Sequence, residues 1–165
     1  MEKQNEIGVL MIQLGTPDSP KRSHVRKYLT EFLNDPRVID INWLGRKLLV
    51  NGIIIPKRNR SSSKLYEELW ELGGGVSPLV TNTVLQQEKL AEKIGDKADV
   101  YMAMRYQFPS IPDVLHQMQK KNYKRIVVLP MFPQYASATT GSAVDKVMEV
   151  IRNWWVIPEV EVINQ

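Results

Sequence analysis

The chain contains no cysteine, and it has no long run of apolar residues. Without cysteine, this segment can hold neither a disulfide framework nor a thiolate zinc site nor an iron–sulfur cluster. A membrane-spanning helix needs ~20 consecutive apolar residues, and the longest run here is far shorter. The opening Met1–Glu6 is polar and lacks the apolar core of a secretion signal, so we expect a cytoplasmic protein.

Only two histidines, His24 and His116, are present among the 165 residues. Histidine is the side chain best suited to proton transfer near neutral pH and to metal binding. Both histidines fall within helical patterns, and neither follows a predicted strand, where α/β proteins place their ligands. We interpret both as surface or helix-capping residues. Neither histidine is therefore taken as a catalytic acid or base or as a metal ligand.

The charges of the chain are nearly balanced. It has 22 Lys and Arg against 18 Asp and Glu, a net charge of +4. This mild excess is consistent with an anionic ligand but too small to indicate nucleic acid, which we do not expect as a partner. The hydrophobic content of 43% is enough for one domain with a sizeable core.

Strand and helix patterns alternate along the chain. Apolar or alternating stretches predict four strands, at residues 7–14, 98–104, 126–131 and 160–163. Helical periodicity predicts helices at residues 23–33, 112–121 and 142–155. This alternation predicts a parallel sheet of about four strands with helices on both faces, a Rossmann-like three-layer α/β fold. Ligands of such sheets bind at the carboxyl ends of the strands.

A loop rich in hydroxyl side chains follows the third predicted strand. Phe132–Ser142 reads Phe-Pro-Gln-Tyr-Ala-Ser-Ala-Thr-Thr-Gly-Ser and leads directly into a helical pattern. Its five hydroxyl residues are Tyr135, Ser137, Thr139, Thr140 and Ser142. Free backbone N–H groups and the helix dipole converge at such a point, which predicts a ligand site. A helix start capped by Ser or Thr is the alternative.

The order of this motif closely resembles the signature of ferrochelatases, the enzymes that insert ferrous iron into a porphyrin to make haem. Similar segments occur in the family's order at Val9–Pro17, Tyr28–Val38, Ser77–Leu79 and Arg105–Pro109. The chain reaches only about the midpoint of a ferrochelatase. The resemblance therefore implies one N-terminal chelatase domain over residues 1–165, with the second domain absent from this chain.

The resemblance also implies an activity. The complete protein is expected to insert Fe²⁺ into protoporphyrin IX or coproporphyrin III, with porphyrin and iron as substrates and no tightly bound cofactor. The family's catalytic histidine and glutamate belong to its second half. We therefore expect this half to bind porphyrin and line the cleft, and the isolated fragment to be inactive.

A non-catalytic, flavodoxin-like module is the alternative function. It would bind a phosphate-bearing ligand at the helix start formed by Thr139–Ser142. This hypothesis explains the hydroxyl-rich loop but not the turn Arg105–Pro109.

The resemblance assigns a set of substrate-binding residues. Leu14 would lie under one face of the macrocycle, where some members carry a metal-ligating tyrosine, and leucine can give only apolar contact. Arg58 and Ser77 align with residues that bind the two propionates, and a guanidinium suits a carboxylate. The full set is Leu14, Arg58, Tyr66, Ser77, Arg105, Tyr106, Tyr135, Ser137, Thr139, Thr140 and Ser142. A buried Arg105 would need a ligand or an internal acid facing it.

Residues 38–80 interrupt the alternation of strands and helices. Trp43–Ile55 is largely apolar, and the basic run Lys57–Arg60 follows it. In ferrochelatases the similar region forms a lip over the porphyrin cleft and sometimes faces the membrane, so we expect an apolar lip and a peripheral membrane contact. An ordinary helix packed on the sheet is the alternative.

The last predicted strand has no helix after it within the chain. In a doubly wound sheet the next helix normally covers such a strand. We therefore expect an exposed apolar patch around Trp154, Trp155, Val162 and Ile163, and self-association of the isolated fragment through it.

Overall fold

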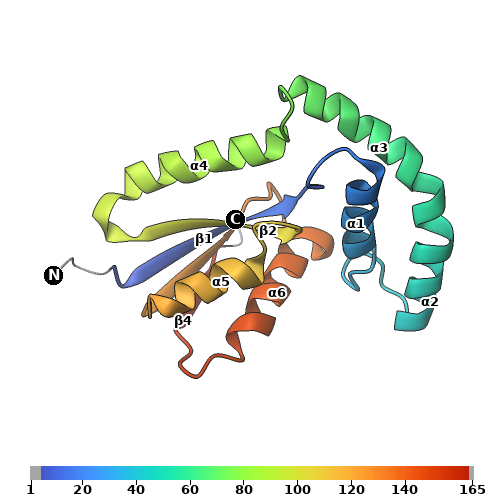
Figure 1. Ribbon diagram of the computed structural model, residues 1–165. Helices are drawn as coiled ribbons and strands as arrows, with labels where there is room; N and C mark the ends of the chain where they lie inside the picture. The colour runs from blue at the N-terminus through green and yellow to red at the C-terminus, as the bar shows by residue number, and fades with distance from the viewer. Residues whose placement is uncertain (1–4, 164–165) are drawn as a thin grey trace. The chain divides into compact units, whose positions relative to one another are not determined.

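The computed structural model describes residues 5–163, which fall into two compact units. One unit comprises Met1–Leu14 together with Thr83–Gln165, and the other comprises Gly15–Asn82. The first unit contains the sheet and the second is helical (Figure 1). Each unit is described by itself below.

The sheet of the first unit has four strands in the order β2-β1-β3-β4. Their bounds are β1 Ile7–Gly15, β2 Asp99–Tyr106, β3 Arg125–Pro130 and β4 Glu159–Val162. β1 pairs with β3 in parallel, from Ile7 opposite Arg125 to Ile12 opposite Pro130. β3 pairs in parallel with β4 from Arg125 to Val128. The predicted α/β fold with a four-stranded parallel sheet is confirmed.

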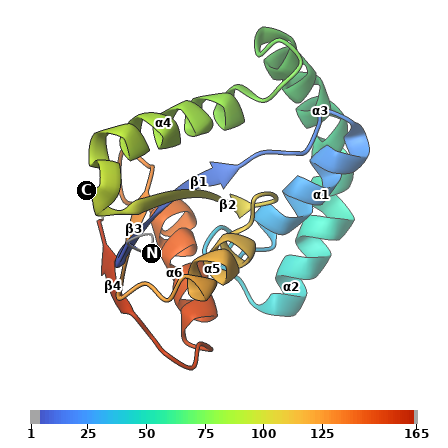
Figure 2. The ribbon, with the colours of Figure 1, turned by 60° about the vertical axis from the view of Figure 1, so that its left-hand side comes forward.

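Helices lie on both faces of this sheet. The elements are α4 (Pro78–Ile94), the short 3₁₀ turn η2 (Gly95–Lys97), α5 (Ile111–Lys120), the π-helical turn η3 (Ser137–Gly141) and α6 (Ser142–Ile151). α5 and α6 pack side by side on one face, and α4 lies along the opposite face (Figures 1 and 2). The Gln87 side-chain amide joins α4 to β2 by donating to the Val100 carbonyl over 2.9 Å.

The main core of the first unit lies between the sheet and the pair α5–α6. On α5 the residues that face inward are Ile111, Val114, Leu115 and Met118, a spacing that places them on one helical face. They pack with sheet residues such as Leu10, Ile12 and Val128. Each fully buried aliphatic side chain of this kind contributes roughly 1.5–3 kcal/mol to stability.

The end of α6 differs from the prediction of a helix up to residue 155. α6 ends at Ile151, and the Trp154 N–H donates to the Ile151 carbonyl over 2.9 Å in a turn. This turn carries the Trp154 side chain back into the core, where only 9% of the residue is exposed. The expectation that Trp154 is part of an exposed patch is therefore wrong, because the core takes up its ring.

The second unit is built from helices. They are α1 (Arg22–Leu33), α2 (Trp43–Leu48), the π-helical segment η1 (Leu49–Ile54) and α3 (Ile55–Leu72). α3 packs against α1. The Tyr66 ring on α3 meets Tyr28 of α1 edge to face at 6.0 Å and Trp70 at 5.9 Å. Such pairs contribute about 0.5–1.5 kcal/mol beyond burial.

The segment expected to form a lip is thus one nearly continuous helical stretch. Arg46 is buried within it, and its guanidinium donates to the carbonyls of Ile39 and Ile41. Trp43, Leu44 and other apolar side chains of the stretch remain largely exposed. Between residues 5 and 163 no helix is long and apolar enough to cross a membrane.

Candidate functional site

A hydrogen-bonded polar group of the first unit joins the end of β2 to the start of α6. The Arg105 Nε–H points at two oxygens of Ser142, at 2.6 Å from the side-chain Oγ and 3.0 Å from the carbonyl oxygen. The Tyr106 hydroxyl lies 3.2 Å from the same Ser142 Oγ. Ser142 and Tyr106 are fully buried, and Arg105 is half-buried. Three of the predicted site residues therefore form one hydrogen-bonded cluster.

The turn after β2 explains why Arg105 is placed there. The Met104 N–H donates to the Pro109 carbonyl over 2.6 Å, which closes the segment between them into a tight loop. Gln107 adopts a positive φ of 67° within this loop. The chain then enters α5, where the Ser110 hydroxyl accepts from the Asp113 N–H. Arg105 and Tyr106 are thus the last residues of a strand held by a short turn.

The hydroxyl-rich loop forms the π-helical turn η3 instead of a capped helix start. Within the described residues, no side chain caps η3 or α6, whose N-cap is Gly141. The interpretation of this segment as a Ser/Thr-capped helix start is therefore wrong. Both the Thr139 and the Gly141 N–H groups donate to the Ala136 carbonyl, so a single backbone oxygen anchors the turn.

The five hydroxyl side chains of this loop divide into two groups. Thr140 and Ser142 are buried, and Thr139 is half-buried. Tyr135 and Ser137 are exposed. The loop therefore presents a phenol and a serine at its surface and directs two other hydroxyls into the protein.

Leu14 is placed by topology at the same edge of the sheet. It lies near the carboxyl end of β1, the strand between β2 and β3, and is half-buried. The carboxyl ends of parallel strands meet at one edge, which is where α/β proteins bind ligands. Leu14, Arg105 and the loop after β3 therefore share that edge in the first unit.

The remaining predicted residues belong to the second unit. Arg58 is exposed on α3, and Tyr66 is half-buried between its aromatic neighbours. Burial raises the pKa of the Tyr66 phenol above its usual range. Ser77 is buried, and its hydroxyl donates to the Thr16 hydroxyl over 3.4 Å.

Thr16 is the partner of a predicted site residue, and the sequence interpretation did not select it. It is buried directly after β1 and receives the Ser77 hydrogen bond. Thr16 falls within the family-like segment Val9–Pro17, but nothing in the sequence distinguishes the threonine itself. Only the fold brings together two residues 61 positions apart.

The two histidines lie on helices, His24 in the second unit and His116 in the first. His24 Nδ1 is 3.0 Å from the Ser19 hydroxyl near the start of α1. His116 is exposed on α5. In the part of the chain that the structure describes, no group of three or more His, Asp or Glu side chains is arranged to hold a metal ion.

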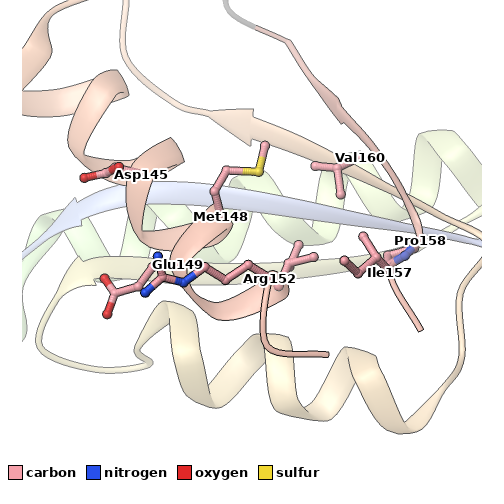
Figure 3. Close-up of a pocket in the computed structure, with 8 residues that line it drawn as sticks. Asp145, Met148, Glu149, Arg152, Ile157, Pro158 and Val160 are labelled. Carbon is pink, nitrogen blue, oxygen red and sulfur yellow. The ribbon is translucent and has the colours of Figure 1, made fainter. Parts of the chain in front are cut away.

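A hollow of about 660 Å³ lies elsewhere in the first unit, between α6 and the start of β4 (Figure 3). Met148 and Val160 form part of its lining, and Glu149 and Arg152 add charged groups (Figure 3). Its lining runs from Asp145 on α6 to Arg152 just after that helix and continues with Ile157, Pro158 and Val160. None of the predicted site residues lines it.

The exposed apolar patch is shifted from its predicted position. Trp155 is 99% exposed, and Val156 and Ile157 beside it are also exposed. Ile163 is 40% exposed, in agreement with the prediction. Val162 is half-buried and packs against the core, so the patch centres on residues 155–157.

Comparison with known proteins decides the family. The family model described as ferrochelatase matches residues 6–165, nearly the whole chain. The chain belongs to the ferrochelatase family. The resemblance read from the sequence is thereby confirmed.

Individual ferrochelatases support the same conclusion. "Ferrochelatase 2" of Shewanella oneidensis is 42% identical over 164 residues, which are 98% of this chain and 50% of that protein. A ferrochelatase of Coxiella burnetii is 43% identical over 147 residues, 89% of this chain and 41% of its own length. One from Hydrogenovibrio crunogenus is 40% identical over 165 residues, 96% of this chain. The chain spans about half the length of the curated relatives it matches.

Proposed function

We propose that this chain forms the porphyrin-binding half of an enzyme that inserts Fe²⁺ into protoporphyrin IX or coproporphyrin III to give haem. The observation that carries the proposal is the cluster of Arg105, Tyr106 and Ser142 at the carboxyl edge of the sheet. Membership of the ferrochelatase family supports the choice of substrate.

The first unit suits a flat, anionic macrocycle. Porphyrin faces must leave water, and Leu14 and the exposed Tyr135 ring offer apolar contact at the sheet edge. Arg105 brings a permanent positive charge to the same edge. It would attract porphyrin carboxylates or the electron-rich ring, and its half-buried position makes that attraction stronger than at a fully exposed site.

Metal insertion itself needs a group that this proposal places outside residues 1–165. Two pyrrole N–H protons leave as Fe²⁺ binds the four nitrogens, with no change in iron oxidation state, so a base must accept the protons. We assign this step to the histidine and glutamate expected in the part of full-length ferrochelatases that this chain does not match. The role of this half is to bind and orient the ring.

The second unit holds the remaining residues that we propose as porphyrin contacts. Arg58 and Ser77 are proposed to bind propionates, Arg58 as a freely accessible guanidinium on α3. Ser77 would have to turn its hydroxyl from Thr16 toward the ligand. Tyr66 would contribute an aromatic wall beside them.

The proposed lip has the exposed apolar residues that membrane contact requires. Leu44 and Leu48 are four residues apart on α2, and Ile53 follows five residues later in the wider π-helical segment, so the three lie along one stripe. All three are exposed, as is Trp43. Lys47 and Lys57 lie close to the stripe in sequence, and basic residues beside an apolar stripe favour binding to an anionic lipid surface.

A chimeric enzyme tests the proposal. The matched half of the Shewanella oneidensis protein would be replaced by this chain, and insertion of Fe²⁺ into protoporphyrin IX would be measured. We expect activity in the chimera, a clear loss in its Arg105→Ala variant, and none in the 165-residue chain alone. A folded but inactive chimera would contradict the proposal, as would metal insertion by the isolated chain.

A further inference from the structure

The contacts with Ser142 hold the Arg105 guanidinium at its Nε atom. Its Nε carries one hydrogen, which is shared between the Ser142 Oγ at 2.6 Å and the Ser142 carbonyl oxygen at 3.0 Å. A bond at Nε fixes the plane of the guanidinium and hence the direction in which both terminal nitrogens point. One residue therefore supplies two oxygens to orient one arginine.

The Ser142 hydroxyl is itself held in place. Its Oγ lies 3.2 Å from the Tyr106 hydroxyl, and both residues are fully buried. Ser142 is the first residue of α6, and Ala143 and Val147 of that helix belong to the core. The serine thus stands on a rigid element, and its oxygen cannot move away from Arg105 without disturbing packed side chains.

We propose that Ser142 is a positioning residue, which acts on the porphyrin only by fixing the direction of the Arg105 guanidinium. This inference rests on the role of Arg105 in the proposed function, and it revises the role of Ser142 from ligand contact to support. A side chain with no exposed surface has no direct access to a ligand in this unit. Its two oxygens contact the Arg105 Nε and so affect the site through the orientation of Arg105.

Nuclear magnetic resonance of the Arg105 Nε–H tests the contact without any ligand. In the chain labelled with ¹⁵N, the signal would be assigned by its loss in Arg105→Lys. We expect a resolved signal that exchanges slowly with water, and at least tenfold faster exchange in Ser142→Ala, because that variant loses the shorter of the two Ser142 contacts. Unchanged exchange in a folded Ser142→Ala chain would overturn the proposal.

A matched pair of variants covers the case in which Ser142→Ala fails to fold. Ser142→Thr and Ser142→Val add nearly the same volume at a fully buried position, and only threonine keeps the hydroxyl. Slow exchange of the Arg105 Nε–H should persist in the threonine variant and be lost in the valine variant. Equal exchange rates in the pair would overturn the proposal.

A double-mutant cycle connects the contact with binding. Protoporphyrin IX affinity would be measured for the chain, Ser142→Ala, Arg105→Lys and the double variant. We expect Ser142→Ala to weaken binding about threefold to tenfold in the parent and hardly at all in the Arg105→Lys background, since lysine has no Nε–H to orient. Equal losses in both backgrounds would show a merely structural serine. Absence of binding by the parent would count against the proposed function, and the exchange measurement would still decide the role of Ser142.

Discussion

The Tyr123 hydroxyl donates a hydrogen bond to the Asp99 carboxylate, at the opposite end of the sheet from the candidate site. Tyr101 lies beside them, its hydroxyl 2.8 Å from that of Tyr123, and Asn5 donates to the other Asp99 oxygen over 2.8 Å. The network joins the start of β2, the turn before β3 and the segment before β1. It is positioned to stabilise the fold and not to bind the ligand.

Because of this network, we expect the stability of the fold to fall both at acid pH and at alkaline pH. The Tyr123 hydrogen bond lowers the pKa of Asp99, so its stabilising effect is complete above the ordinary aspartate pKa of about 4 and is lost as pH falls through the lowered value. Burial and the Asp99 bond raise the pKa of Tyr123, so its contribution is present below about pH 10 and is lost at more alkaline pH.

Tyr123→Phe should lower the free energy of unfolding at pH 7 by about 1–2 kcal/mol, because it removes the donor to a charged acceptor. It should also flatten the acid limb of the stability curve. Urea unfolding followed between pH 3 and pH 8 measures both effects. A variant as stable as the parent, with the same acid dependence, would contradict the role of the network.

Gly8 of β1 is packed so closely that an added Cβ would force neighbouring side chains to shift. A Cβ at this position would lie 2.7 Å from Met118 Cε and 2.9 Å from Tyr123 Cδ2. Gly8→Ala should therefore destabilise the chain by about 1–3 kcal/mol. Gly52→Ala is the control, since nothing lies within 4 Å of its added Cβ, and it should leave stability unchanged or raise it by up to about 1 kcal/mol. Thermal unfolding of the two variants measures the difference, and equal melting temperatures would contradict it.

Ser77→Ala separates two roles for a buried hydroxyl. If Ser77 only supports Thr16, the variant should lose about 1 kcal/mol of stability and keep its porphyrin affinity. The proposed function predicts in addition a weaker affinity for porphyrin, by about fivefold or more, since a bond to a charged propionate is lost. Ser61→Ala is the control, because its hydroxyl bonds only locally to the Arg58 carbonyl on the exposed side of α3. Unaltered affinity in Ser77→Ala would remove Ser77 from the proposed site.

The patch at residues 155–157 predicts self-association of the chain. Trp155 and Ile157 are exposed, and Ile157 also lines the hollow of Figure 3. Solvent-exposed apolar groups of this size favour association. Sedimentation velocity should show concentration-dependent dimers or larger species. The double variant Trp155→Ser and Ile157→Ser should be monomeric at the same concentrations, with an unchanged melting temperature. A parent chain that stays monomeric at high concentration would contradict the prediction.

The sheet could be predicted because each strand carries a local apolar pattern, as in Val127 and Val128 of β3. The end of α6 could not, because apolar periodicity continues to Trp154 although its ring turns back into the core. The π-helical turn η3 could not be predicted either, because its residues have local preferences for a different structure. Ser and Thr residues favour helix caps in general, whereas the shape of this turn depends on the Ala136 carbonyl that it encloses.

The sequence predicted which residues belong to the candidate site, but not which of them form hydrogen bonds with one another. Arg105 and Ser142 were selected from motifs, and the structure joins them across 37 residues. The bond between Thr16 and Ser77 depends on a similar long-range approach. Local patterns contain no information on such pairs, because the fold alone decides which side chains meet.

One titration tests the central claim most directly. Protoporphyrin IX would be titrated with the 165-residue chain, with Arg105→Ala and with Arg152→Ala, which removes the same charge from an exposed position outside the proposed site. Binding is followed by the porphyrin absorption band. We predict a saturable shift for the parent and for Arg152→Ala, and an affinity about tenfold weaker for Arg105→Ala. No shift with the folded parent chain, or identical affinities in all three proteins, would contradict the account.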